Sequence, residues 1–162
     1  MSTSGIVPLI PKVASELGVA LAISLHATND TLRSELMPIN KSWPLTELLN
    51  ACREYASLAK SALQRITFEY VMLDGVNDDP YKDARDLIKL LNGIPSHINL
   101  LPFHSWPQAR YSSSPMSRIQ EFSQVLIRAG MFTTIRRTRG EDIMAACGQL
   151  KSSLNTKNAF RK

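Results

Sequence analysis

The sequence predicts an α/β fold in which parallel strands alternate with helices. Four short segments with little polar alternation have the length expected of strands in a covered parallel sheet. They lie at 19–25, 65–73, 97–103 and 131–137. Amphipathic segments separate them, with glycine or proline near their ends. Strands that alternate with helices form βαβ units with right-handed crossovers.

Each expected helix has a recognisable beginning or end. Residues 6–17 give a short helical pattern, and Gly18 is expected to end it. Asn29 or Asp30 can cap a short helix that Pro38 ends. Longer helices are predicted at 45–59, at about 80–91 and at 116–129.

Three or four parallel strands with helices on one side would make an open half-barrel. Residues 2–5, STSG, look like the loop after a strand, yet no strand precedes them here. We therefore expect that the chain starts partway through a larger fold. Met1 would then be an internal or misassigned start.

The composition is that of one water-soluble domain in a reducing compartment. The chain has 162 residues, of which 44% are hydrophobic, and a net charge of +5. No apolar run approaches the roughly 18 residues of a membrane span. The N-terminus lacks the basic region of a signal peptide. Two cysteines are too few for a disulfide framework, so a cytoplasmic protein is expected.

The positive charge is concentrated at the C-terminal end. Residues 128–162 hold eight Lys/Arg against two Asp/Glu, which is a net charge of +6. The remaining residues hold eleven against twelve, a net charge of −1. This asymmetry favours a polyanion such as nucleic acid as a partner, although a basic tail that only improves solubility gives the same pattern.

Polar residues stand where the predicted strands end, which is where parallel sheets bind ligands. They are Ser2, Ser4, Ser24, His26, Asp74, Asn77 and His104. His26 is equally consistent with a histidine that only satisfies the end of a strand. Asp74 and the following NDD could hold a metal, but the glycine and proline around them favour a turn. The sequence contains no GxGxxG, P-loop, HExxH or CxxC motif.

The segment 133–150, TTIRRTRGEDIMAACGQL, places arginines before a cysteine between small residues. Arg136, Arg137 and Arg139 would favour a thiolate at Cys147 and attract phosphates. The alternative is a small buried cysteine beside solvent-exposed arginines. Cys52 lies on an apolar helical stripe and is predicted to be core. Glu69 stands among apolar residues of a strand, where a structural hydrogen bond or ion pair is the favoured interpretation.

Several stretches together resemble one enzyme family, the RlmN-type radical S-adenosylmethionine (SAM) methyltransferases. They are STSGIVP, LAISLHA, NDTLRSELMPINK, FEYVMLDGVND, INLLPF and RRTRGEDIMAACGQL, and they span roughly residues 2–150. The resemblance is to the C-terminal portion of the family. It implies the C-terminal half of a radical-SAM (β/α) barrel and methylation of adenosine C2 in 23S rRNA and tRNA. Cfr-type enzymes, which methylate C8, are the close alternative.

The resemblance also implies roles for individual residues. Ser2 and the segment Ser24, Leu25 and His26 match SAM contacts. His104 stands where the family has an asparagine that contacts SAM, and a histidine differs from asparagine in shape and protonation. Cys147 matches the cysteine that carries the methyl group as S-methylcysteine.

The family binds a [4Fe–4S] cluster with a CxxxCxxC motif that this sequence lacks. We therefore expect the isolated chain to be inactive, with no metal ligands of its own. It divides into the half-barrel (1–130), a last strand with the catalytic-cysteine loop (131–150), and a basic flexible tail (151–162). The resemblance implies a monomeric full-length enzyme away from membranes. A half-barrel remnant that binds RNA without catalysis is the other hypothesis.

Overall fold

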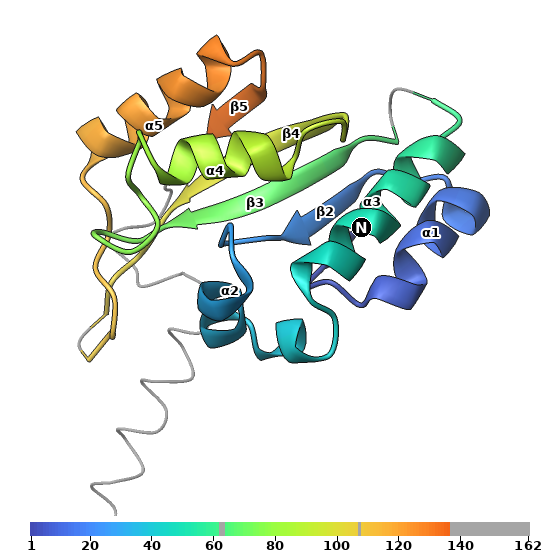
Figure 1. Ribbon diagram of the computed structural model, residues 1–162, viewed down its shortest axis with the longest axis horizontal. Coiled ribbons are helices and arrows are strands. Elements are labelled where there is room, and N and C mark those ends of the chain that lie inside the picture. Colours follow the sequence, from blue (N-terminus) through green and yellow to red (C-terminus); the bar gives the residue numbers. More distant parts are fainter. Residues whose placement is uncertain (62–63, 107, 137–162) are drawn as a thin grey trace, which may run out of the picture.

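The computed structural model describes residues 1–61, 64–106 and 108–136. They form one parallel sheet of five strands in the order β1-β2-β3-β4-β5, which is also their order in the chain. The strands are β1 (Ser2–Thr3), β2 (Leu21–Ser24), β3 (Ile66–Met72), β4 (Ser96–Pro102) and β5 (Phe132–Ile135). The α/β prediction, with parallel strands and intervening helices, is confirmed (Figure 1).

The sequence prediction missed one strand. Ser2 and Thr3 pair in parallel with Ala22 and Ile23, so the residues taken for a loop begin with an edge strand. The loop after it starts at Ser4, and Gly5 has a positive φ of 113°. Two residues are too few to show strand periodicity in a sequence, which explains the omission.

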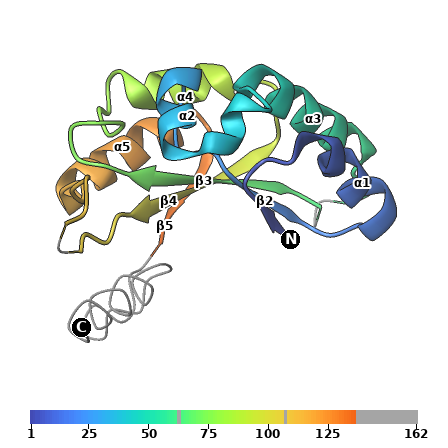
Figure 2. The same cartoon turned by 90° about the horizontal axis from the view of Figure 1, so that it is seen from below.

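The helices lie on one side of the sheet, as predicted, and no described helix covers its other side (Figure 2). The α-helices are α1 (Ile10–Lys12), α2 (Asp30–Leu36), α3 (Leu45–Leu58), α4 (Asp83–Leu90) and α5 (Met116–Arg128). A 3₁₀ turn (Val7–Leu9) and a π turn (Val13–Leu17) flank α1, and a second 3₁₀ turn (Pro38–Lys41) follows α2. None of the helices in the described part is both long and apolar enough to cross a membrane.

The predicted helix ends correspond to observed caps. Gly18 ends the π turn in the left-handed conformation, with φ 63°, where glycine avoids steric strain. The Asn29 side chain accepts a hydrogen bond from Leu32 N at 2.9 Å and so caps α2. The helix ends at Leu36, two residues before Pro38.

The core lies between the sheet and the helices. Alternate residues of β3 are buried, and their side chains (Ile66, Phe68, Tyr70 and Met72) face the helical layer. Tyr70 stacks on Phe122 of α5 with 5.7 Å between the ring centroids. Cys52 is fully buried on α3, as the helical stripe predicts. Because the helices cover only one face, the intervening strand residues remain half-exposed on the other.

Two neighbouring residues of α5 test this packing. Leu126 is fully buried, whereas Ile127 is 46% exposed. We expect Leu126→Ala to lower the free energy of unfolding by about 2 to 5 kcal/mol, because it removes core contacts and leaves a cavity. Ile127→Ala should cost under about 1 kcal/mol. Urea unfolding followed by circular dichroism measures both losses, and equal losses would contradict this packing.

Candidate functional site

The candidate site lies at the carboxyl ends of the parallel strands. In Figure 1 these ends point toward α2 and the loops that follow β3 and β4. The loop after β4 is held against α2, because Tyr111 Oη donates to Glu35 Oε1 at 2.7 Å. The strand ends, α2 and these two loops therefore frame one region of the molecule.

A buried arginine joins the ends of β1 and β2. Arg33 of α2 is fully buried. Its Nη2 donates to Ser4 O at 2.9 Å and Ser24 O at 3.0 Å, and its Nε donates to Leu25 O at 3.2 Å. A buried guanidinium is tolerated only when its donors are satisfied, and here main-chain carbonyls supply most of the acceptors.

A polar network fixes this arginine in turn. Arg33 Nη1 donates to Asn40 Oδ1 at 2.8 Å, and Asn40 Nδ2 donates to Asp30 Oδ1 at 2.9 Å. The same Asp30 oxygen accepts from Leu45 N at the start of α3. No role was predicted for Arg33 or Asn40, because a short helix followed by Pro-Ile-Asn does not reveal that its arginine is buried.

His26 follows β2 with an unusual backbone, at φ 61°. Its main-chain N donates to Glu69 O at 3.3 Å, and its Nδ1 accepts a hydrogen bond from Val71 N at 3.2 Å. Burial, followed by the charge of Arg33, lowers the His26 pKa from 6.5 to about 4. The ring is therefore neutral near pH 7, and its proton sits on Nε2, which bonds no other described residue. His26 Nδ1 therefore satisfies the main chain at a strand end, whereas Nε2 remains available as a donor to a ligand.

The loop after β3 is a turn, as the sequence favours. Asn77 is buried, and its Nδ2 donates to His26 O at 2.9 Å and Val71 O at 2.7 Å. Asp78 accepts from Gly75 N, and Arg118 Nη1 pairs with both Asp74 (2.9 Å) and Asp78 (3.2 Å). The carboxylates of Asp74 and Asp78 are therefore occupied by contacts with the turn and with Arg118 of α5.

The remaining predicted residues differ in what they can contact. Ser24 faces the open side of the sheet, and its hydroxyl bonds no described residue. Leu25 has a buried side chain. Its main-chain N donates to Glu69 O, and its main-chain O accepts from Arg33 Nε, so its role here is structural. Ser2 is exposed on β1, and His104 is half-buried just after β4. Arg136 is exposed, and its N donates to Leu100 O at 2.8 Å.

Arg137, Arg139 and Cys147 lie outside the described residues, as do most of the predicted cysteine segment and the basic tail. The structure therefore bears on the half-barrel and on Arg136.

The donor set fits SAM and does not fit an iron–sulfur cluster. The Ser24 hydroxyl and His26 Nε2 are neutral donors suited to a polar nucleoside ligand. Among the described residues there is no group of three potential metal ligands. Cys52 is the one cysteine in this part of the chain, and burial raises the pKa of its thiol to about 12. Its side chain is fully buried in the core, and it is part of no group of three potential ligands among the described residues.

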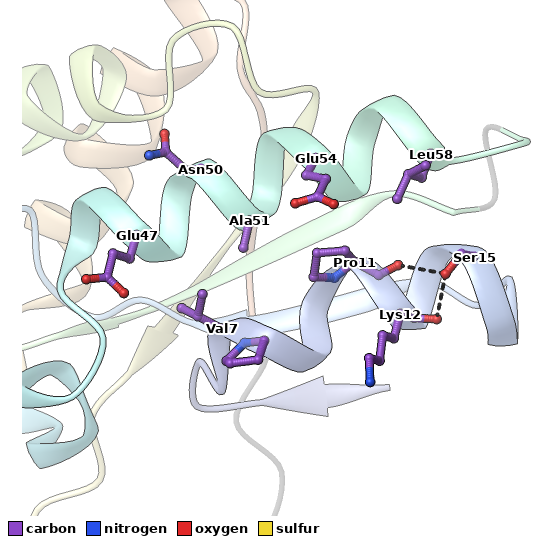
Figure 3. Close-up of a pocket in the computed structure, with 10 residues that line it drawn as sticks. Val7, Pro11, Lys12, Ser15, Glu47, Asn50, Ala51, Glu54 and Leu58 are labelled. Atoms are coloured by element: carbon purple, nitrogen blue, oxygen red, sulfur yellow. Dashed lines mark hydrogen bonds between the residues drawn. The ribbon is translucent and has the colours of Figure 1, made fainter.

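A cavity of about 650 Å³ lies elsewhere, between α1 and α3 (Figure 3). Its lining mixes apolar residues such as Val7 and Leu58 with Lys12, Glu47 and Glu54. Neither Ser24 nor His26 lines it. The helices separate this groove from the open face of the sheet, so its size does not make it the candidate site.

Comparisons with known proteins agree with the resemblance seen in the sequence. No model of a protein family matches the chain. A dual-specificity RNA methyltransferase RlmN from Jannaschia sp. is 52% identical over 162 residues, which are 100% of this chain and 41% of that protein. The RlmN of Xanthobacter autotrophicus is 56% identical over 152 residues, 94% of this chain and 36% of that protein. The chain thus spans about two fifths of the length of these relatives.

Two solved structures are also similar. A radical SAM methyltransferase from Sphaerobacter thermophilus has a TM-score of 0.84 and 47% identity, over 91% of this chain and 42% of that one. A domain of a pyruvate-formate lyase-activating enzyme from Bacteroides vulgatus has a TM-score of 0.65 at 21% identity, over 84% and 79% of the two chains. The second likeness concerns the fold alone. The first supports a partial radical-SAM barrel.

Replacing Arg33 tests whether it holds the strand ends. We expect Arg33→Met to lower the free energy of unfolding by about 3 kcal/mol or more, because several buried acceptors lose their donor. Arg33→Lys should lose less, since the amine can still reach some of them. Arg85→Met removes an exposed arginine of α4 and is the matched control, which should change stability by less than about 0.5 kcal/mol. A loss no greater than that of the control would contradict this role.

The pKa of His26 predicts a pH dependence of stability. The unfolded chain binds the proton near pH 6.5, whereas the folded chain binds it near pH 4. Stability from this group is therefore complete above pH 6.5, falls as the pH drops toward 4, and then levels off after a loss of roughly 3 kcal/mol. Urea unfolding at several pH values should show a shallower dependence in His26→Gln. Parallel curves for the two proteins would rule out a low pKa.

Proposed function

Because this chain belongs to the RlmN-type radical SAM methyltransferases and matches about two fifths of their length, we propose that it forms the C-terminal half of an enzyme that methylates C2 of adenosine in 23S rRNA and tRNA. The similarity over the whole chain to proteins of that name is the observation that carries the proposal. The polar strand ends of a matching half-barrel support it.

The residues at the strand ends bind SAM in this proposal. Ser24 and His26 Nε2 donate hydrogen bonds to it, and Leu25 keeps the two in place. Ser2 and His104 complete the contacts from the neighbouring strand ends. SAM supplies the methyl group when it is bound. The left-handed His26 backbone and the Arg33 network hold these donors rigidly, which lowers the entropy cost of binding.

Cys147 is the residue that carries the methyl group. Adenine C2 is not nucleophilic, so it cannot take a methyl group directly, whereas a thiolate can. We infer that Cys147 becomes S-methylcysteine before the carbon is passed to the base. Its neighbours in the sequence, Ala146 and Gly148, are small, which favours this role.

Arg136, Arg137 and Arg139 contact RNA phosphates in this proposal, consistent with the charge of the C-terminal segment. The complete enzyme acts in the cytoplasm as a monomer. Because the sequence has two cysteines and no CxxxCxxC motif, we propose that the 162-residue chain by itself has no methyltransferase activity.

Two alternatives make different predictions. A Cfr-like enzyme would methylate C8 of adenosine with the same C-terminal architecture. A half-barrel remnant would bind RNA through its basic segment and would catalyse nothing. The charge asymmetry of the sequence favours RNA binding in each case.

Joining this chain in frame to the N-terminal part of the Jannaschia relative tests the proposal. We expect the chimera to form 2-methyladenosine in 23S rRNA and tRNA, detected by mass spectrometry of nucleosides. Cys147→Ala should abolish the product, because the other cysteine of this chain, Cys52, is buried in the core. Cys52→Ala is the control and should retain activity, since Cys52 is core.

The alternatives correspond to other results of the same assay. 8-Methyladenosine would favour the Cfr-like enzyme. RNA binding without any methylated nucleoside would favour the remnant. Full activity of Cys147→Ala would exclude a methylated cysteine at that position.

A further inference from the structure

The open face of the sheet carries a row of polar side chains. The parallel register aligns Ser24 of β2 with Glu69 of β3, Glu69 with Asn99 of β4, and Asn99 with Thr134 of β5. Their neighbours Ile23, Phe68 and Ile98 are buried against the helices. Since side chains alternate along a strand, the four polar residues lie together on the face that no described helix covers.

The two halves of this row differ. On the side of β4 and β5 the polar groups satisfy each other: Thr134 Oγ1 donates to Asn99 Oδ1 at 3.2 Å, and His97 Nε2 lies 2.7 Å from Thr134 Oγ1. On the side of β2 and β3, the Ser24 hydroxyl and the Glu69 carboxylate bond no other described residue. Glu69 is half-buried nonetheless. The structural hydrogen bond that the sequence favours for Glu69 is therefore not found among the described residues.

The main chain of Glu69 is also hydrogen-bonded to the two residues that follow β2. Its main-chain O accepts from Leu25 N at 3.0 Å and from His26 N at 3.3 Å. The His26 ring bonds Val71 N, two residues further along β3. The register thus places the Glu69 side chain next to that of Ser24 on the same face of the sheet, and the main chain of Glu69 holds the segment that carries His26.

A half-buried carboxylate keeps contact with water, but it becomes costly without a partner when something covers the face and removes that water. The ligand that covers it must therefore bring a positive charge or hydrogen-bond donors. SAM brings both, in its ammonium and sulfonium groups and its ribose hydroxyls, and carboxylates commonly accept from ribose hydroxyls.

We propose that Glu69 is a further SAM-binding residue, whose carboxylate accepts hydrogen bonds from O–H or N–H groups of the ligand next to Ser24. This inference rests on the proposed function, since it concerns the same site. It adds an acidic group on the sheet face itself to contacts otherwise expected beyond the strand ends.

Nuclear magnetic resonance of the ¹⁵N-labelled chain tests this without any activity. We expect added SAM to shift the amide signals of Ser24, Leu25 and His26. Glu69→Gln should raise the dissociation constant about tenfold or more, because it removes a charge-assisted hydrogen bond. Glu54→Gln, which changes an exposed glutamate of α3, is the matched control and should leave the constant unchanged.

A second ligand separates the two kinds of donor. 5′-Methylthioadenosine keeps the ribose hydroxyls but has no ammonium or sulfonium charge. If Glu69→Gln weakens both ligands equally, the carboxylate accepts from the ribose. If it weakens SAM alone, the carboxylate accepts from the amino-acid end. Either result supports the inference.

Two results would overturn the inference about Glu69, and they differ in whether they also overturn the proposed SAM site. If SAM shifts the Ser24–His26 signals and Glu69→Gln and Glu69→Ala bind it as tightly as the unaltered chain, Glu69 is no ligand contact and the proposed function stands. If millimolar SAM shifts none of these signals, the SAM site assigned here falls together with the inference. Because Glu69 has no side-chain partner among the described residues, both variants should keep the urea midpoint of unfolding, which confirms that they fold.

Discussion

The burial of one guanidinium constrains the arrangement of the strand ends. Arg33 bonds the carbonyls of Ser4, Ser24 and Leu25, so the first two strands end at a fixed height relative to α2. The close approach requires a glycine beside it. A Cβ on Gly5 would stand 3.2 Å from Arg33 Nη2 and 3.3 Å from Leu48 Cδ1, and the φ of 113° disfavours other residues independently. This packing, together with the hydrogen bonds of His26 to β3 and Asn77, sets the positions of Ser24 and His26.

Much of the fold could be read from the sequence, because its signals are local. The segment 65–73 contains β3, and Gly18 and Asn29 mark helix ends where they were expected. The strand at Ser2 and Thr3 was not predicted, since two residues are too few to show the alternation of a strand. Their pairing depends on Ala22 and Ile23, which are about twenty residues away, and such a contact leaves no local pattern.

The site was less predictable than the fold, because it depends on contacts between residues that are distant in the sequence. Ser24, His26 and Asn77 could be proposed, because polar residues after an apolar run mark a strand end. Arg33 could not, since its burial depends on carbonyls from two other elements. Glu69 was visible in the sequence, but only the register with Ser24 and Asn99 places its carboxylate in a polar row on the open face. The sequence therefore shows which residues carry polar groups, but it does not show which of these groups lie close together in the fold.

The strand order has a consequence for how the chain folds. Every strand pairs with the one that precedes it in the sequence, so each βα step completes an edge onto which the next strand adds. Strands can therefore be added to the sheet in the order in which they are synthesised, and no strand has to wait for a distant segment of the chain. A nascent chain on the ribosome could assemble the Arg33 network once Asn40 and the start of α3 have emerged, well before the last strand is translated.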